Sequence, residues 1–253
     1  MKIKALLAIL CMGLLVGCSS STITPEVSDK GLYEGLDGKE TYSAVIKKMN
    51  DEVTYYLSNI EDNGNTSTNE TYKLNNQFCF ISKAVYTEGD AEALFYTITQ
   101  GTNFHTLYLG ANKIYAYNMV EDYPNEVTEI YKNYLDNTNY SIYDVQRDDQ
   151  GDQIVLTLKM KMTEEYALGD AAPDEVTRYA IDEMTINEDG FISQEKLVYY
   201  TNDQFKEVSE TGRTVKNSDF NKKGQSDFDK EIELMKSCDG LQDDDAKEKL
   251  GLK

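Results

Sequence analysis

Short runs in which apolar and polar residues alternate, separated by turn residues, make up most of this sequence after residue 52. The clearest run is Ile154 to Met162, where Ile, Leu and Met alternate with Val, Thr and Lys. Alternation of this kind places successive side chains on opposite faces of a strand. Turn signals such as Asp62-Asn63-Gly64-Asn65 separate the runs at hairpin spacing. The sequence therefore predicts an antiparallel meander.

Helical spacing of apolar residues replaces this alternation at a few places. The first is Glu40 to Asn50, whose apolar stripe is Tyr42, Val45, Ile46 and Met49. A second helix is predicted from Pro124, a residue suited to a first helical position; its apolar residues are Val127, Ile130, Tyr131, Tyr134 and Leu135. A third is predicted over Asp227 to Ser237, and a short helix or frayed tail after Gly240.

Apolar side chains occur on both faces of several predicted strands, as in the run from Phe78 to Tyr86. A closed sandwich would account for this, and so would a curved sheet wrapped around apolar helices. The element order favours the second, because one amphipathic helix precedes the strands and another divides them. The predicted fold class is therefore α+β, a curved antiparallel sheet forming an unclosed half-barrel with amphipathic helices packed on its concave side.

The strand predicted between Thr177 and Ile186 changes its apolar parity along its length. Tyr179 and Ile181 occupy one parity, whereas Met184 and Ile186 occupy the other. We interpret the change as a β-bulge near Asp182-Glu183.

The first residues have the features of a secretory signal: Lys2 and Lys4 precede an apolar run from Ala5 to Val16. The run is shorter than the roughly 20 residues that a membrane-spanning helix needs. Its end, Leu15-Val16-Gly17-Cys18, resembles the lipobox of bacterial lipoproteins. This resemblance implies that residues 1–17 are a signal peptide and that Cys18 is acylated. Residues 18–39 are then a flexible tether, and the protein is expected on the extracytoplasmic face of the cell membrane.

The formal net charge of −20 limits the partners of such a domain. An acidic surface repels nucleic acid and anionic lipid head groups, so we expect attachment to the lipid bilayer through acylated Cys18 alone. We expect a monomer. Cys79 and Cys238 would remain after acylation and export; the sequence leaves open whether they form a disulfide or are two separate thiols.

No catalytic or metal-binding motif is apparent in the sequence. His105 is the only histidine, and its position in an alternating run favours packing over a role in nucleophilic catalysis. Acidic clusters such as Asp243 to Asp245 lack the alternate acids and central glycine of a calcium loop. We therefore expect no enzyme, no metal and no cofactor.

The element order and the stretch Met184 to Ile192, two strands around an Asp-Gly turn, resemble the lipoprotein-carrier fold of LolA and LolB, including the LppX and LprG type of lipoprotein. The resemblance covers about Glu40 to Val215 and implies a LolA-like domain over residues 40–238 with an acidic tail over 239–253. Arg147, Arg178 and Arg213 match no ligand residue of the family.

That resemblance implies a lipoprotein that binds a lipid or other amphiphile in an apolar cavity between sheet and helices. The predicted cavity residues lie on the first two helices and on the Ile154–Met162 strand: Tyr42, Val45, Ile46, Met49, Val127, Ile130, Tyr131, Tyr134, Leu156, Leu158 and Met160. The alternative is a non-enzymatic surface module that binds protein or glycan and has a filled core.

Overall fold

The computed structural model describes residues 31, 33–88, 91–100, 103–110, 113–120, 127, 129–166 and 174–251. The predicted signal peptide, Cys18, most of the predicted tether and Pro124 lie outside the described residues.

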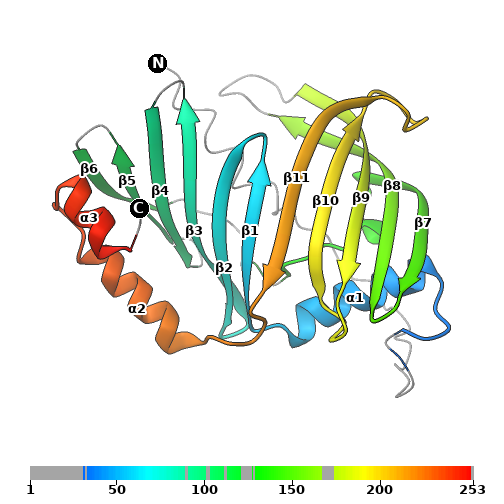
Figure 1. Cartoon of the computed structure of the whole chain (residues 1–253), viewed down its shortest axis with the longest axis horizontal. Helices are drawn as coiled ribbons and strands as arrows, with labels where there is room; N and C mark the ends of the chain where they lie inside the picture. Colours follow the sequence, from blue (N-terminus) through cyan, green and yellow to red (C-terminus); the bar gives the residue numbers. More distant parts are fainter. Residues whose placement is uncertain are drawn as a thin grey trace.

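One antiparallel sheet of 11 strands dominates the described chain (Figure 1). Its order is β6-β5-β4-β3-β2-β1-β11-β10-β9-β8-β7. The strands are β1 (Tyr55–Asp62), β2 (Asn65–Leu74), β3 (Gln77–Glu88), β4 (Ala91–Gln100), β5 (Asn103–Gly110), β6 (Lys113–Val120), β7 (Tyr140–Gln150), β8 (Gln153–Tyr166), β9 (Asp174–Ile186), β10 (Ile192–Tyr200) and β11 (Val208–Ser218). The sheet is curved and unclosed, with β6 and β7 at its two edges, which confirms the predicted antiparallel α+β architecture.

Helix α1 (Gly38–Glu52) begins where the sequence supplies a capping box. The Asp37 side chain accepts a hydrogen bond from the Glu40 backbone, and the Glu40 side chain accepts one from Asp37. Gly38 permits close approach to β7, because a Cβ there would lie 2.2 Å from the Val145 carbonyl oxygen. Packed structure begins ahead of α1: Tyr33, which the sequence places in the tether, is 1% exposed.

Helix α1 lies against the half of the sheet that contains β7 to β10 (Figure 1). Its predicted stripe forms the first core with side chains of these strands. A second core lies beneath α2 (Gln225–Lys236) and α3 (Asp243–Lys249), which pack on the other half of the sheet. Tyr55 belongs to the second core, whereas its neighbour Tyr56 belongs to the first. Because adjacent strand residues point to opposite faces, the two helical layers lie on opposite faces of the sheet.

The helix predicted around Val127 to Leu135 is wrong for the described part of that stretch. Residues 129–133 are irregular and lead into the single 3₁₀ turn η2 (Tyr134–Asp136). The Asn50 side chain explains the difference, because its amide oxygen accepts from the backbones of Ile130 (2.8 Å) and Tyr131 (3.1 Å). Its amide nitrogen donates to the Tyr131 carbonyl oxygen at 2.7 Å. These backbone groups are therefore satisfied by a side chain of α1 instead of by a helix of their own.

The bulge predicted near Asp182-Glu183 is also wrong. Pairing of β8 with β9 is continuous from Ile154–Ile186 to Tyr166–Asp174. The buried residues of β9 keep one parity throughout, and they are Ala180, Asp182, Met184 and Ile186. The apparent change of phase arises because an aspartate occupies a position that faces the core.

Candidate functional site

The structure brings most of the predicted cavity residues together on the α1 face. Those of α1 and β8 are at most 3% exposed and belong to one cluster; they are Tyr42, Val45, Ile46, Met49, Leu156, Leu158 and Met160. Ile130, Tyr131 and Tyr134 are partly buried against the same cluster. Val127 lies elsewhere, beside β3, where its carbonyl oxygen accepts a hydrogen bond from the Phe78 backbone at 2.8 Å.

Three ionisable side chains of neighbouring strands lie at the border of this apolar cluster, and we call Asp182, Glu195 and Arg213 the polar cluster. Asp182 of β9 stands opposite Leu158 of β8 in the register. Glu195 of β10 is 3% exposed and accepts a hydrogen bond from Arg213 Nη2 at 2.8 Å. The polar cluster therefore begins on β9, one strand away from the apolar residues of β8, beneath the α1 layer.

Asp182 is the unusual member of the polar cluster. Its side chain is 0% exposed, and neither carboxyl oxygen has a hydrogen-bond partner among the described residues. Burial raises the pKa of Asp182 well above its usual range; the negative charge of Glu195 raises it further, while Arg213 opposes both. Because buried polar groups almost always have a partner, a fully buried carboxyl group without one among the described residues makes Asp182 a candidate binding group.

Arg213 connects the polar cluster to solvent. Its side chain is 41% exposed, whereas that of Glu195 is 4% exposed. The nearby Glu195 carboxylate raises the pKa of Arg213 above its ordinary value, which keeps the guanidinium charged. Its Nε has no partner among the described residues.

A backbone irregularity precedes Arg213. The pairing of β10 with β11 shifts register between Lys196 and Val198, which marks a β-bulge. Gly212 lies there, and a Cβ on it would come within 2.3 Å of the Leu197 carbonyl oxygen. This close approach requires a glycine at position 212, directly before Arg213 in β11.

Residues 129–136, which we call the strap, lie over this region. Ile130, Tyr131, Tyr134 and Leu135 pack against the apolar cluster, and polar contacts also hold the segment. Besides the bonds from Asn50, the Tyr42 hydroxyl donates to the Lys132 carbonyl oxygen at 3.1 Å and accepts from the Tyr134 backbone at 3.2 Å. Asn217 of β11 donates to the Tyr131 hydroxyl at 3.1 Å. Burial raises the pKa of Tyr42 and of Tyr134 above the ordinary range.

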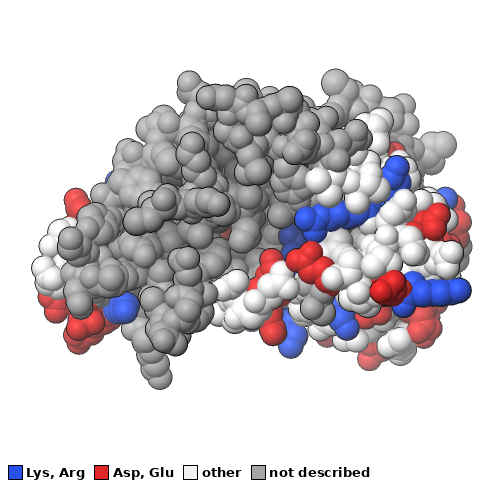
Figure 2. Space-filling view, turned by 90° about the horizontal axis from the view of Figure 1, so that it is seen from above, with Lys and Arg blue, Asp and Glu red and all other residues white. Residues whose placement is uncertain are grey.

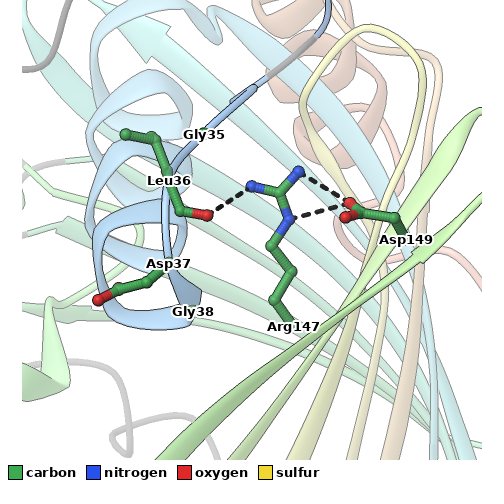
Figure 3. A pocket seen from close by; sticks show the side chains of 6 residues that line it. All are labelled: Gly35, Leu36, Asp37, Gly38, Arg147 and Asp149. Carbon is green, nitrogen blue, oxygen red and sulfur yellow. Dashed lines mark hydrogen bonds and ion pairs between the residues drawn. The ribbon is translucent and has the colours of Figure 1, made fainter.

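A separate surface hollow of about 530 Å³ lies at the start of α1, lined by Gly35, Leu36, Asp37, Gly38, Arg147 and Asp149 (Figure 3). The chain itself uses the donors of Arg147: Nη1 bonds to Tyr33 O (2.6 Å), Leu36 O (2.9 Å) and Thr41 Oγ1 (3.0 Å), while Nε and Nη2 bond to Asp149. Arg147 therefore fastens the segment before α1 to β7, and this explains its position without a ligand.

Other sequence candidates contribute no site in the described part of the chain. Side chains of the metal-ligating types form no group there able to hold an ion. His105 pairs with Ile98 in the sheet, and its side chain lies outside the described part. Cys79 and Cys238 are both buried in the second core and are not joined by a disulfide. In the view of Figure 2, described Lys and Arg side chains lie beside Asp and Glu.

The polar cluster was not predicted from the sequence, although the sequence contains a signal for one of its members, Asp182. The change of parity in the Thr177–Ile186 run marks Asp182 as an acid in a core-facing position. Glu195 and Arg213 gave no comparable signal, because only the strand register places them beside Asp182.

Comparison with protein-family models and with curated protein sequences finds no match to this chain. Among the described residues, no helix is both long and apolar enough to span a membrane.

Proposed function

We propose that this chain is an exported lipoprotein, held on the extracytoplasmic face of the cell membrane by acylated Cys18, and that it binds a lipid or other amphiphile between α1 and the sheet. The lipobox-like sequence at Leu15 to Cys18 supports the anchor. In this proposal the face covered by α1 is the concave one, as in the lipoprotein carriers that the sequence resembles.

The unpartnered carboxyl group of Asp182 carries the proposal of an amphiphile. It lies opposite Leu158, which belongs to the apolar cluster beneath α1. A ligand with a polar head and an apolar tail would supply the missing hydrogen-bond partner and remain in apolar surroundings along the rest of its length. A wholly apolar ligand would leave Asp182 unsatisfied, and a wholly polar one would gain nothing from the neighbouring core.

The strap provides the route by which a tail enters. Ile130 and Leu135 are only partly buried, whereas Val45 and Leu156 of the cluster against which they pack are 0% exposed. The strap is attached to α1 by the hydrogen bonds of Asn50 and Tyr42. In this proposal a tail enters between α1 and the sheet by displacing the strap side chains.

Native mass spectrometry of the full chain, purified without detergent, tests this function directly. We expect a co-purified lipid or saturable uptake of a fluorescent fatty amphiphile. Ile130→Asp, which places a charge on the strap, should weaken uptake, while Glu183→Gln on the opposite parity of β9 serves as the control. Absence of both bound lipid and saturable uptake in the wild type would refute the proposal.

A second candidate function, a surface module for protein or glycan, is favoured by an aromatic group on the other face of β7 to β10. The ring of Phe205 lies 5.8 Å from that of Tyr143, 6.4 Å from that of Tyr179 and 5.7 Å from that of Tyr200. Tyr143 is 51% exposed, and exposed aromatic side chains of this kind occur at binding surfaces. Tyr143→Ala tests this candidate: it should abolish capture on a glycan array and leave amphiphile uptake unchanged.

A further inference from the structure

We propose that the head group of the amphiphile is a protonated amine, received by Asp182. This inference rests on the proposed function, because it specifies the ligand of the same site.

Charge favours a cation over an anion in this place. The polar cluster contains the carboxyl groups of Asp182 and Glu195 and the single guanidinium of Arg213. Arg213 is bonded to Glu195 at 2.8 Å, so its charge is already matched. A carboxylate or phosphate head group would add negative charge beside an unmatched acid in a buried site, whereas an ammonium group would match Asp182.

Hydrogen bonding favours the same class. A carboxylate offers about four acceptor positions, and Asp182 uses none of them among the described residues. A primary ammonium group carries only donors, about three of them, and satisfies such an acceptor better than a hydroxyl group with a single donor.

Binding of an ammonium group must also be linked to protons. In the ligand-free protein, burial favours the neutral acid form of Asp182. The ionisable groups that act on it electrostatically are Glu195 from β10 and Arg213 from β11; Tyr42 from α1 and Tyr134 from the strap feel its charge in turn. Formation of an ion pair with an ammonium group requires the carboxylate, so binding releases a proton and the affinity for the amine rises with pH until Asp182 is ionised without ligand.

The test compares amphiphiles with equal chains and different heads: decylamine, decanol and decanoate, each titrated below its micelle concentration into the full chain. We expect the wild type to bind decylamine about tenfold more tightly than decanol, and decanoate most weakly. Asp182→Asn should abolish the preference for the amine and keep the affinity for decanol. Glu183→Gln on the same strand should behave as the wild type.

The outcomes separate the two proposals. If none of the three amphiphiles binds, the proposed function is wrong. If decanol or decanoate binds as tightly as decylamine, the function stands and the amine inference is overturned. Should Asp182→Asn fail to fold, the comparison of decylamine with decanol and decanoate in the wild type still decides the inference.

Discussion

Replacing Asp182 by Asn should stabilise the protein near neutral pH and remove part of its pH dependence. Asp182 is fully buried without a hydrogen-bond partner among the described residues, and burial raises its pKa in the folded state. The folded protein therefore binds a proton that the unfolded chain releases above its ordinary pKa of about 3.9. The contribution of Asp182 to stability is complete below that pH and is lost as pH rises towards the raised pKa of the folded state.

The size of the effect follows from this linkage. Between the two pKa values, the free energy of unfolding of the wild type loses about 1.4 kcal/mol for each pH unit through Asp182 alone. Asn has the shape of the protonated acid and does not titrate. The two proteins should thus be nearly equal in stability at about pH 4, and the variant should become progressively more stable as pH rises.

Urea unfolding of the wild type, Asp182→Asn and Glu183→Gln from about pH 4 to about pH 8 measures this difference. Comparison with the wild type at each pH removes the contribution of the other carboxyl groups. Glu183 is exposed on the same strand, so its variant should follow the wild type. A difference between the wild type and Asp182→Asn that stays constant with pH would mean that Asp182 is hydrated or paired, and the reasoning would fail.

Three further predictions concern the core, the start of α1 and the anchor. Ile46→Ala should cost about 2–5 kcal/mol of unfolding free energy because Ile46 is 3% exposed, whereas Ile130→Ala on the partly buried strap should cost less; equal losses in urea titrations would make the strap part of the rigid core. Gly38→Ala should lower the melting temperature, because its Cβ would lie 2.2 Å from the Val145 carbonyl oxygen; an unchanged melting temperature would contradict this close approach. Cys18→Ala should abolish incorporation of radiolabelled fatty acid and membrane fractionation, and continued labelling would disprove the anchor.

The strands could be predicted because their signal is local. Alternation over Ile154 to Met162 and the turn residues between runs require no knowledge of partners, and the observed sheet is antiparallel as expected. The stripe of Tyr42, Val45, Ile46 and Met49 likewise identified α1 correctly, since its spacing and its capping box agree. Where local signals agree with one another, the sequence alone determines the element.

The errors occurred where a distant residue decides the local structure. Nothing in the sequence around Ile130 and Tyr131 indicates that Asn50 will bind their backbone groups. The polar cluster escaped prediction for the same reason, because Glu195 and Arg213 approach Asp182 only through the pairing of three strands. The predicted cavity residues of α1 and β8 pack in one core. The change of parity at Asp182, whose buried carboxyl group has no partner among the described residues, was interpreted as a bulge.

The position of the strap over the polar cluster follows from the sheet topology. Strands β6 and β7 are consecutive in the chain but lie at opposite edges of the sheet, so the connection between them must cross its width. The described part of this crossing, residues 129–136, runs over the α1 face and is bound there by Asn50 and Tyr42. Apart from the single turn η2, the strap lies outside the regular elements. If the proposed amphiphile enters here, its binding should change the environment of Tyr131 and Tyr134, which fluorescence of the tyrosines can detect.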